Sequence, residues 1–195
     1  MYVLEERVSK TRFVFVAMLV ATSLLAAGTR SGVAQSPTAI AIPTATAEGC
    51  DQVPAYLESR QQIMSEFLLD LEAVFPQVAT PVMENGDELF GAIATMTPEQ
   101  ATALAKAYDT AADKIEQVAA PPVATFYNDI QVQLYRLSAD VFEEAGQTSL
   151  NEAGNAFNDE LIAMGEAVAL SGAAATGVCP AFGDVVIFDQ TQAAM

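Results

Sequence analysis

The sequence predicts an all-α protein, namely an antiparallel up-down-up-down four-helix bundle that has a short extra helix between helices one and two and is closed by one disulfide. Three observations lead to this fold. Apolar residues recur at alternating steps of three and four along four segments, as they do on one face of a helix. Only residues 185–188 have the composition of a β-strand, and the sequence offers no partner strand for them. The two cysteines flank the first and the last of the four segments.

The first predicted helix covers residues 53–75. Pro54 falls in its first turn, where a missing N–H costs nothing, and Pro76 follows directly after its end. The apolar face of this helix consists of Leu57, Met64, Phe67, Leu71 and Val74. A short helix is expected at residues 87–96, before the second long one.

The three remaining helices are predicted from similar signals. The second long helix starts at Thr97, since the run from Thr97 to Gln100 has the form of a capping box, and it stops before Pro121. The third covers residues 123–146 and has the most regular apolar spacing. The fourth starts near Ser149 and runs to Gly172. Because the connections are short, neighbouring helices are expected to run antiparallel.

The cysteines give an independent argument for this topology. In an up-down-up-down bundle the start of helix one and the end of helix four lie at the same end, and Cys50 and Cys179 stand just outside these two points. Closing so long a loop by a disulfide stabilises a protein by about 4 to 5 kcal/mol in the chain-entropy model. Free or intermolecular thiols are the alternative.

The N-terminus has the layout of a secretory signal peptide. Three basic residues precede an apolar run at 13–27, and small residues follow at 28, 32 and 34. The run is shorter than the roughly 20 residues that a membrane-spanning helix needs. Cleavage after Ala34 is therefore expected, with an uncleaved anchor as the alternative. Both interpretations place the rest of the chain outside the cytoplasm.

Residues 35–48 are rich in threonine, proline and alanine and lack any apolar period, so they are expected to form a disordered linker or tether. Lipidation of Cys50 is the less favoured alternative, because Glu48 and the distance from the apolar run do not fit a lipobox. The predicted organisation is a signal peptide at 1–34, the linker at 35–48, a helical domain at 49–182 and a C-terminal tail at 183–195.

The charge balance excludes some partners. The chain has 8 basic and 25 acidic residues and a net charge of −17. Loss of residues 1–34 removes four basic and two acidic residues, which brings the net charge to −19. Such a chain repels nucleic acids and anionic lipids, so no nucleic-acid partner is expected, and a membrane is contacted only through an uncleaved N-terminal segment.

The absence of histidine from the sequence excludes several kinds of active site. Ser-His-Asp and Cys-His arrangements, His-containing zinc sites and the Glu-x-x-His di-iron pattern cannot be built. No glycine-rich phosphate loop is present either. No catalytic residue and no cofactor are therefore predicted.

Two sets of residues remain as candidate sites. Glu84, Asp87 and Glu88 surround a predicted Asn-Gly turn and offer oxygen ligands for a divalent cation, although acidic rows of this kind ordinarily form a solvated surface. Arg60 occupies a core-side position of the first helix, where it could pair with a carboxylate such as Glu160 or hold an anionic ligand. The favoured interpretation of Arg60 is a side chain that reaches the surface from the edge of the apolar face.

Together these features predict an exported, tethered or secreted helical-bundle module that binds a protein, an envelope component or a small ligand without catalysis. The alternative is a carboxylate-dependent secreted hydrolase that acts on cell-wall glycans, because paired acids are the groups that such chemistry needs.

Overall fold

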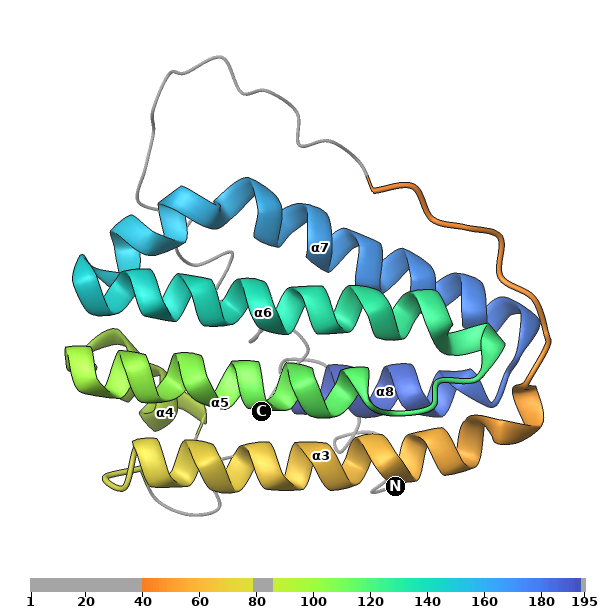
Figure 1. Cartoon of the computed structure of the whole chain (residues 1–195), viewed down its shortest axis with the longest axis horizontal. Helices are drawn as coiled ribbons and strands as arrows, with labels where there is room; N and C mark the ends of the chain where they lie inside the picture. The colour runs from red at the N-terminus through yellow and green to blue at the C-terminus, as the bar shows by residue number, and fades with distance from the viewer. Residues whose placement is uncertain (1–39, 79–85, 194–195) are drawn as a thin grey trace, which may run out of the picture.

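The computed structural model describes residues 40–78 and 86–193, and all regular secondary structure in these two ranges is helical (Figure 1). The prediction of an all-α protein is confirmed. The elements are η2 (Cys50–Gln52), α3 (Val53–Val74), α4 (Gly86–Ala94), α5 (Pro98–Glu116), η4 (Pro122–Ala124), α6 (Thr125–Gln147), α7 (Leu150–Val178) and α8 (Phe182–Ala193).

The start of α5 has the predicted capping box. The Thr97 hydroxyl accepts a hydrogen bond from the backbone N–H of Gln100, and the Gln100 side-chain oxygen accepts one from the N–H of Thr97. The Gln100 amide nitrogen also donates to the carbonyl of Val74 at 3.1 Å. One side chain therefore caps the start of α5 and the end of α3.

The helix α7 is longer than the sequence predicts, since it continues through Gly172 to Val178. Gly172 serves packing instead of ending the helix, because a methyl group there would come within 3.0 Å of Val186 and 3.2 Å of Tyr127. The stop comes from Pro180, which disfavours helical geometry in the residue before it. Cys179 accordingly has φ −136° and ψ 90°.

The segment predicted as a tail forms the helix α8. The β-branched and aromatic residues at 185–188 have strand propensity, but local propensity is weak when an apolar side chain can be buried in a helix. Val185 of α8 is completely buried. This segment is therefore part of the hydrophobic core.

The long helices are stacked in chain order, with α5 on α3, α6 on α5 and α7 on α6 (Figure 1). The short helix α8 contacts both α3 and α7, so it bridges the two outer helices of the stack. Helix α4 packs Leu89 and Ile93 against a buried cluster that includes Phe67 and Phe75 of the α3 region. A second buried cluster, with Tyr56 and Phe182, lies beside the disulfide.

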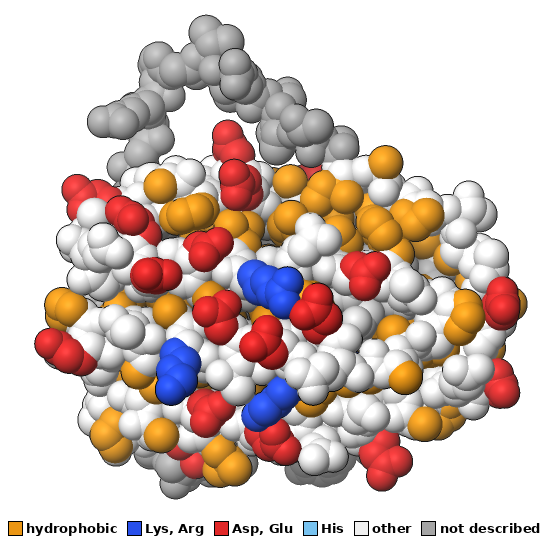
Figure 2. Space-filling view, in the orientation of Figure 1, with side chains coloured by type: hydrophobic (Ala, Val, Ile, Leu, Met, Phe, Trp, Pro, Cys, Tyr) orange, Lys and Arg blue, Asp and Glu red, His pale blue; other side chains and the backbone are white. Residues whose placement is uncertain are grey.

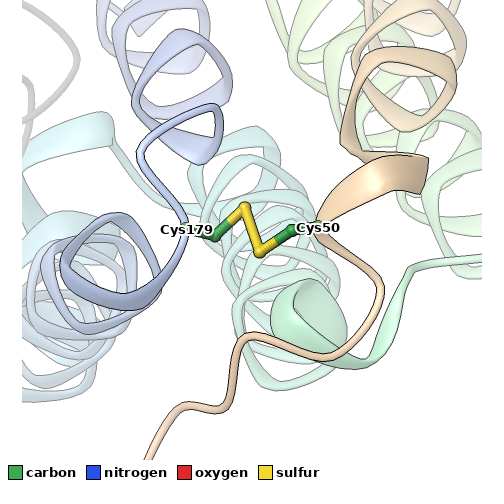
Figure 3. Close-up of a disulfide and its surroundings, with 2 residues drawn as sticks. All are labelled: Cys50 and Cys179. Atoms are coloured by element: carbon green, nitrogen blue, oxygen red, sulfur yellow. A yellow bond between two sulfur atoms is a disulfide. The ribbon is translucent and has the colours of Figure 1, made fainter.

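The predicted disulfide joins Cys50 and Cys179, whose Cα atoms are 5.8 Å apart (Figure 3). Gly49 precedes it in a left-handed conformation with φ 79°, and a methyl group at this position would meet Pro122 at 2.6 Å. The carbonyl of Glu48 accepts a hydrogen bond from the N–H of Val123. The chain is thus fixed to the α5–α6 connection immediately before it enters the bundle.

Candidate functional site

A buried ion pair joins helices α3 and α8. Arg60 of α3 is 2% exposed and Asp189 of α8 is 9% exposed. The Nη2 atom of Arg60 lies 3.1 Å from Oδ1 and 3.2 Å from Oδ2 of Asp189. The segments that carry the two charges are separated by almost the whole bundle sequence, so only the folded chain brings them together.

Helix α6 supplies two more donors to the same carboxylate. The Tyr127 hydroxyl donates to Oδ2 of Asp189 at 2.8 Å, and the Gln131 amide nitrogen lies 3.5 Å from the same oxygen. Gln131 also donates to the hydroxyl oxygen of Tyr127 at 3.1 Å. Both residues are buried and stand one helical turn apart, which places them on the same face of α6.

A neighbouring buried bond extends this polar network. The Tyr56 hydroxyl donates to Oδ1 of Asn128 at 3.0 Å, and the Asn128 amide nitrogen donates to the carbonyl of Ile115. The ring of Phe182 lies against the rings of both Tyr56 and Tyr127. The region where α3, α6 and α8 meet therefore contains both apolar contacts and hydrogen bonds.

The network determines the protonation of its members. Burial raises the pKa of Tyr127 well above its ordinary value, and the Asp189 carboxylate raises it further. Burial alone would lower the pKa of Arg60, but Asp189 and the adjacent tyrosines raise it, and the net direction is upward. Tyr127 is thus a permanent donor and Arg60 a permanent cation at neutral pH.

One hydrogen-bonding group of the network has no partner. The Nη1 atom of Arg60 is buried and makes no hydrogen bond to the described residues. Guanidinium groups usually bind a carboxylate through two parallel N–H groups, whereas Asp189 meets Nη2 alone. The arginine therefore has a donor that Asp189 does not use.

The structure does not bring Arg60 and Glu160 together. Glu160 is exposed on α7, and the carboxylate partner of Arg60 is Asp189. The interpretation of Arg60 as a side chain that reaches the surface is wrong, because its side chain is 2% exposed. Sequence reasoning marked Arg60 as out of pattern but missed its partners. One feature of the sequence could have indicated a buried polar site: Gln131 is a polar residue four positions after Tyr127 on the apolar face of α6.

The acidic residues proposed as metal ligands are only partly described. Glu84 lies outside the described residues, Asp87 belongs to the first turn of α4, and Glu88 is exposed on the same helix. Within residues 40–78 and 86–193, no group of three or more potential ligand residues is close enough to hold a metal ion. The metal-site hypothesis gains no support from these residues.

An open hollow of about 660 Å³ lies where the start of α3 faces the end of α5. Its lining includes Asp51, Tyr56, Ser59, Lys114 and Gln117. Asp51 is the one carboxylate residue of this lining, whereas hydrolysis of a glycoside requires a pair. The hollow therefore does not have the composition of a glycosidase site.

Two basic residues at the surface, Lys114 and Arg136, are paired with acids. Lys114 lies 2.8 Å from Glu66, and Arg136 lies 2.6 Å from Glu116. In Figure 2 the basic side chains are surrounded by acidic ones, whereas apolar side chains gather over α7. The face that Figure 2 shows thus has a charged region over α5 and α6 and an apolar region over α7.

Helix α7 combines an apolar sequence with low burial. Among the described residues it is the one helix that is long and apolar enough to cross a membrane, by length and composition only. Of its most apolar stretch, 22% is buried. Leu170 is 58% exposed, and Phe157, Leu161 and Met164, which have the spacing of one helix face, are only half-buried.

No family model, curated protein or solved structure matches the chain.

Proposed function

We propose that the protein is an exported, non-catalytic binding module, and that a partner protein covers the apolar surface of α7. The observation that carries this proposal is the low burial of α7 despite its apolar sequence. Apolar patches of this kind on a folded protein are characteristic of interaction sites. Since the chain is strongly acidic, the partner surface is neutral or basic around an apolar centre.

The location outside the cytoplasm is part of the proposal. The layout of residues 1–34 supports export, and the Cys50–Cys179 disulfide is typical of an oxidising compartment. The segment from residue 40 to Glu48 has no helix or strand, in keeping with a tether that holds the domain.

We also propose the up-down-up-down topology for α3, α5, α6 and α7. The colour order in Figure 1, in which each long helix runs opposite to the one before it, supports this arrangement. In this topology α7 is an outer helix with one neighbouring long helix, α6, which leaves much of its circumference uncovered.

Site-specific photo-crosslinking tests the proposed surface. Leu170 on α7 and Leu69 on α3 are matched probes, because they are the same residue type and are 58% and 64% exposed. A benzophenone amino acid at position 170 is expected to capture a discrete protein in the extracytoplasmic fraction of the host, whereas the same group at position 69 captures none. Leu170→Glu is expected to abolish a complex that Leu69→Glu preserves.

Both leucines are exposed, so neither substitution is expected to change the thermal midpoint by more than about 1 to 2 °C. Equal capture at both positions, or no capture at position 170, would contradict the proposal.

A further inference from the structure

The carboxylate of Asp189 is bound by a set of hydrogen-bond donors that all come from other helices. Arg60 comes from α3, and Tyr127 and Gln131 come from α6, whereas Asp189 alone comes from α8. Three side chains from two long helices therefore converge on one point, and α8 inserts a single anionic group there.

The donor set contains an N–H group that Asp189 does not use. Arg60 is 2% exposed, yet its Nη1 atom has no hydrogen-bond partner among the described residues. A carboxylate that approaches Arg60 along the plane of its guanidinium group can accept from two of its nitrogens at once. Asp189, fixed by the helix that carries it, meets one nitrogen only. An independent ligand would not have this restriction.

The rest of the α8 binding surface is apolar. Val185 is completely buried beside Val53 and Tyr127, and Phe188 packs against the cluster around Phe67. A molecule that replaced α8 would therefore meet an apolar surface with one carboxylate-binding point. This composition, a mostly apolar site with a few placed polar groups, is typical of small-ligand sites.

Helix α8 makes fewer contacts with its neighbours than the long helices make with one another. It is the last described helix, and it contacts α3 and α7. The disulfide at Cys179 keeps the preceding residues in place when α8 moves. A displacement beyond Phe182 would expose the donor set and leave the four long helices paired.

We propose that Arg60, Tyr127 and Gln131 form a binding site for a small apolar molecule that carries a carboxylate, and that α8 closes this site with Asp189 as an internal substitute for the ligand. This site is separate from the proposed partner surface of α7, and it does not depend on that proposal. Binding of the ligand releases α8, so the affinity of the site is reduced by the stability of the closed state.

Ligand affinity in the Asp189→Asn variant tests this inference. The probe is decanoate, titrated by calorimetry into the purified, oxidised protein. Asp189→Asn removes the competing charge and keeps the side-chain size, so decanoate is expected to bind roughly tenfold tighter than to the unmodified chain. Asp184→Asn is the matched control, since Asp184 is an exposed acid on the same helix. It is expected to bind like the unmodified chain.

Titration with decanol distinguishes the contribution of the carboxylate to binding from that of the apolar chain. It has the same hydrocarbon tail, and it is expected to gain much less affinity from Asp189→Asn than decanoate does, because it brings no charge to Arg60. Adding Arg60→Met to Asp189→Asn is expected to remove the gain for decanoate. Equal affinity of decanoate for the Asn variant and the unmodified chain, or an equal gain for decanol, would overturn the inference.

A second measurement covers variants that fold poorly. Asp189→Ala leaves the donor set without an anion, and sodium acetate is expected to raise its thermal midpoint, because acetate replaces the missing carboxylate. Sodium chloride at the same ionic strength is expected to have no such effect, and Asp184→Ala is expected to respond to neither salt. Absence of a difference between acetate and chloride would count against a carboxylate site.

Discussion

Arg60 and Asp189 are charged side chains with little access to bulk water. Arg60 depends on Asp189 for its solvation, and Asp189 depends on Arg60 and on the hydroxyl of Tyr127. Removal of one partner of a buried ion pair costs about 3 to 5 kcal/mol, because the other charge stays buried without compensation. A well-packed apolar pair is often equally stable or more stable. The stability of the bundle therefore does not by itself explain why charges occupy this position.

The tyrosines give a prediction at the residue scale. Burial raises the pKa of Tyr56, Tyr108, Tyr127 and Tyr135, and that of Tyr108 is raised to about 12 from an ordinary value of 10.0. At lower pH both folded and unfolded chains keep these protons. Between the ordinary and the raised pKa, only the unfolded chain loses them, so the free energy of unfolding falls as pH rises through this window.

The measurement is an alkaline titration of tyrosinate absorbance beside circular dichroism, and the absence of tryptophan keeps the absorbance signal simple. We expect the four tyrosines to ionise together, at the pH where helicity is lost. Tyr2 lies outside the described residues and is expected to account for any early ionisation if the N-terminus is retained. Ionisation of a second tyrosine near the ordinary pKa, with helicity intact, would contradict this expectation.

At the scale of the helix, the start of α5 joins two elements through one side chain. Gln100 completes the capping box with Thr97 and donates to the last carbonyl of α3 at Val74. The end of α3 would otherwise leave this carbonyl without a partner, since the final carbonyls of a helix have no intrahelical donor. The capping box thus also fixes the position of α5 relative to α3.

Thr97→Ala is expected to lower the free energy of unfolding by about 1 kcal/mol, because it removes the N-cap acceptor. Thr102→Ala is the matched control, since Thr102 is exposed in the same helix and bonds only to a carbonyl one turn back. It is expected to change stability by less than about 0.5 kcal/mol. Urea denaturation followed by circular dichroism measures both changes, and equal effects would contradict the role of the cap.

Gln100→Glu separates the two functions of this side chain. The carboxylate still accepts from the N–H of Thr97, but it has no donor for the carbonyl of Val74. We expect a smaller loss of stability than for Gln100→Ala, which removes both bonds.

The long helices could be predicted from sequence because their signals are local. Apolar spacing and the prolines place both ends of α3 and α6 within two residues of their observed positions, and the capping box places the start of α5, although α5 already ends at Glu116, before the predicted stop at Pro121. Helix α8 could not be predicted, because the burial of Val185 against Val53 and Tyr127 depends on the assembled bundle. The candidate site could be predicted only in part for the same reason. Arg60 stood out in the sequence, but its pairing with Asp189 depends on the assembled bundle.

For the whole molecule, the disulfide is the strongest single constraint on the unfolded chain. It joins residues 129 positions apart, so it closes nearly the entire bundle into one loop. The sequence predicted this pair from topology, and the structure confirms it. The predicted signal peptide, linker and charge-based exclusion of nucleic acid remain predictions that concern the chain in its cellular setting.

Replacement of both cysteines by serine is expected to lower the free energy of unfolding by about 4 to 5 kcal/mol in the chain-entropy model. For a chain of this size, the thermal midpoint should fall by about 10 to 15 °C. Addition of a thiol reductant to the unmodified protein is expected to produce the same fall and to leave the double serine variant unchanged. A midpoint that does not respond to reductant would contradict the assignment of this bond as a stabilising cross-link.

The disulfide also determines how mechanical force passes through the protein. A chain held by its N-terminal segment and pulled at its C-terminal helix carries the load from Cys50 through the two sulfur atoms to Cys179 and into α8. The residues between the cysteines lie outside this covalent path, so α3 to α7 are loaded only through their non-covalent contacts while the bond is intact. The first structure to yield under such a pull is the contact of α8 with α3, including the bond between Arg60 and Asp189.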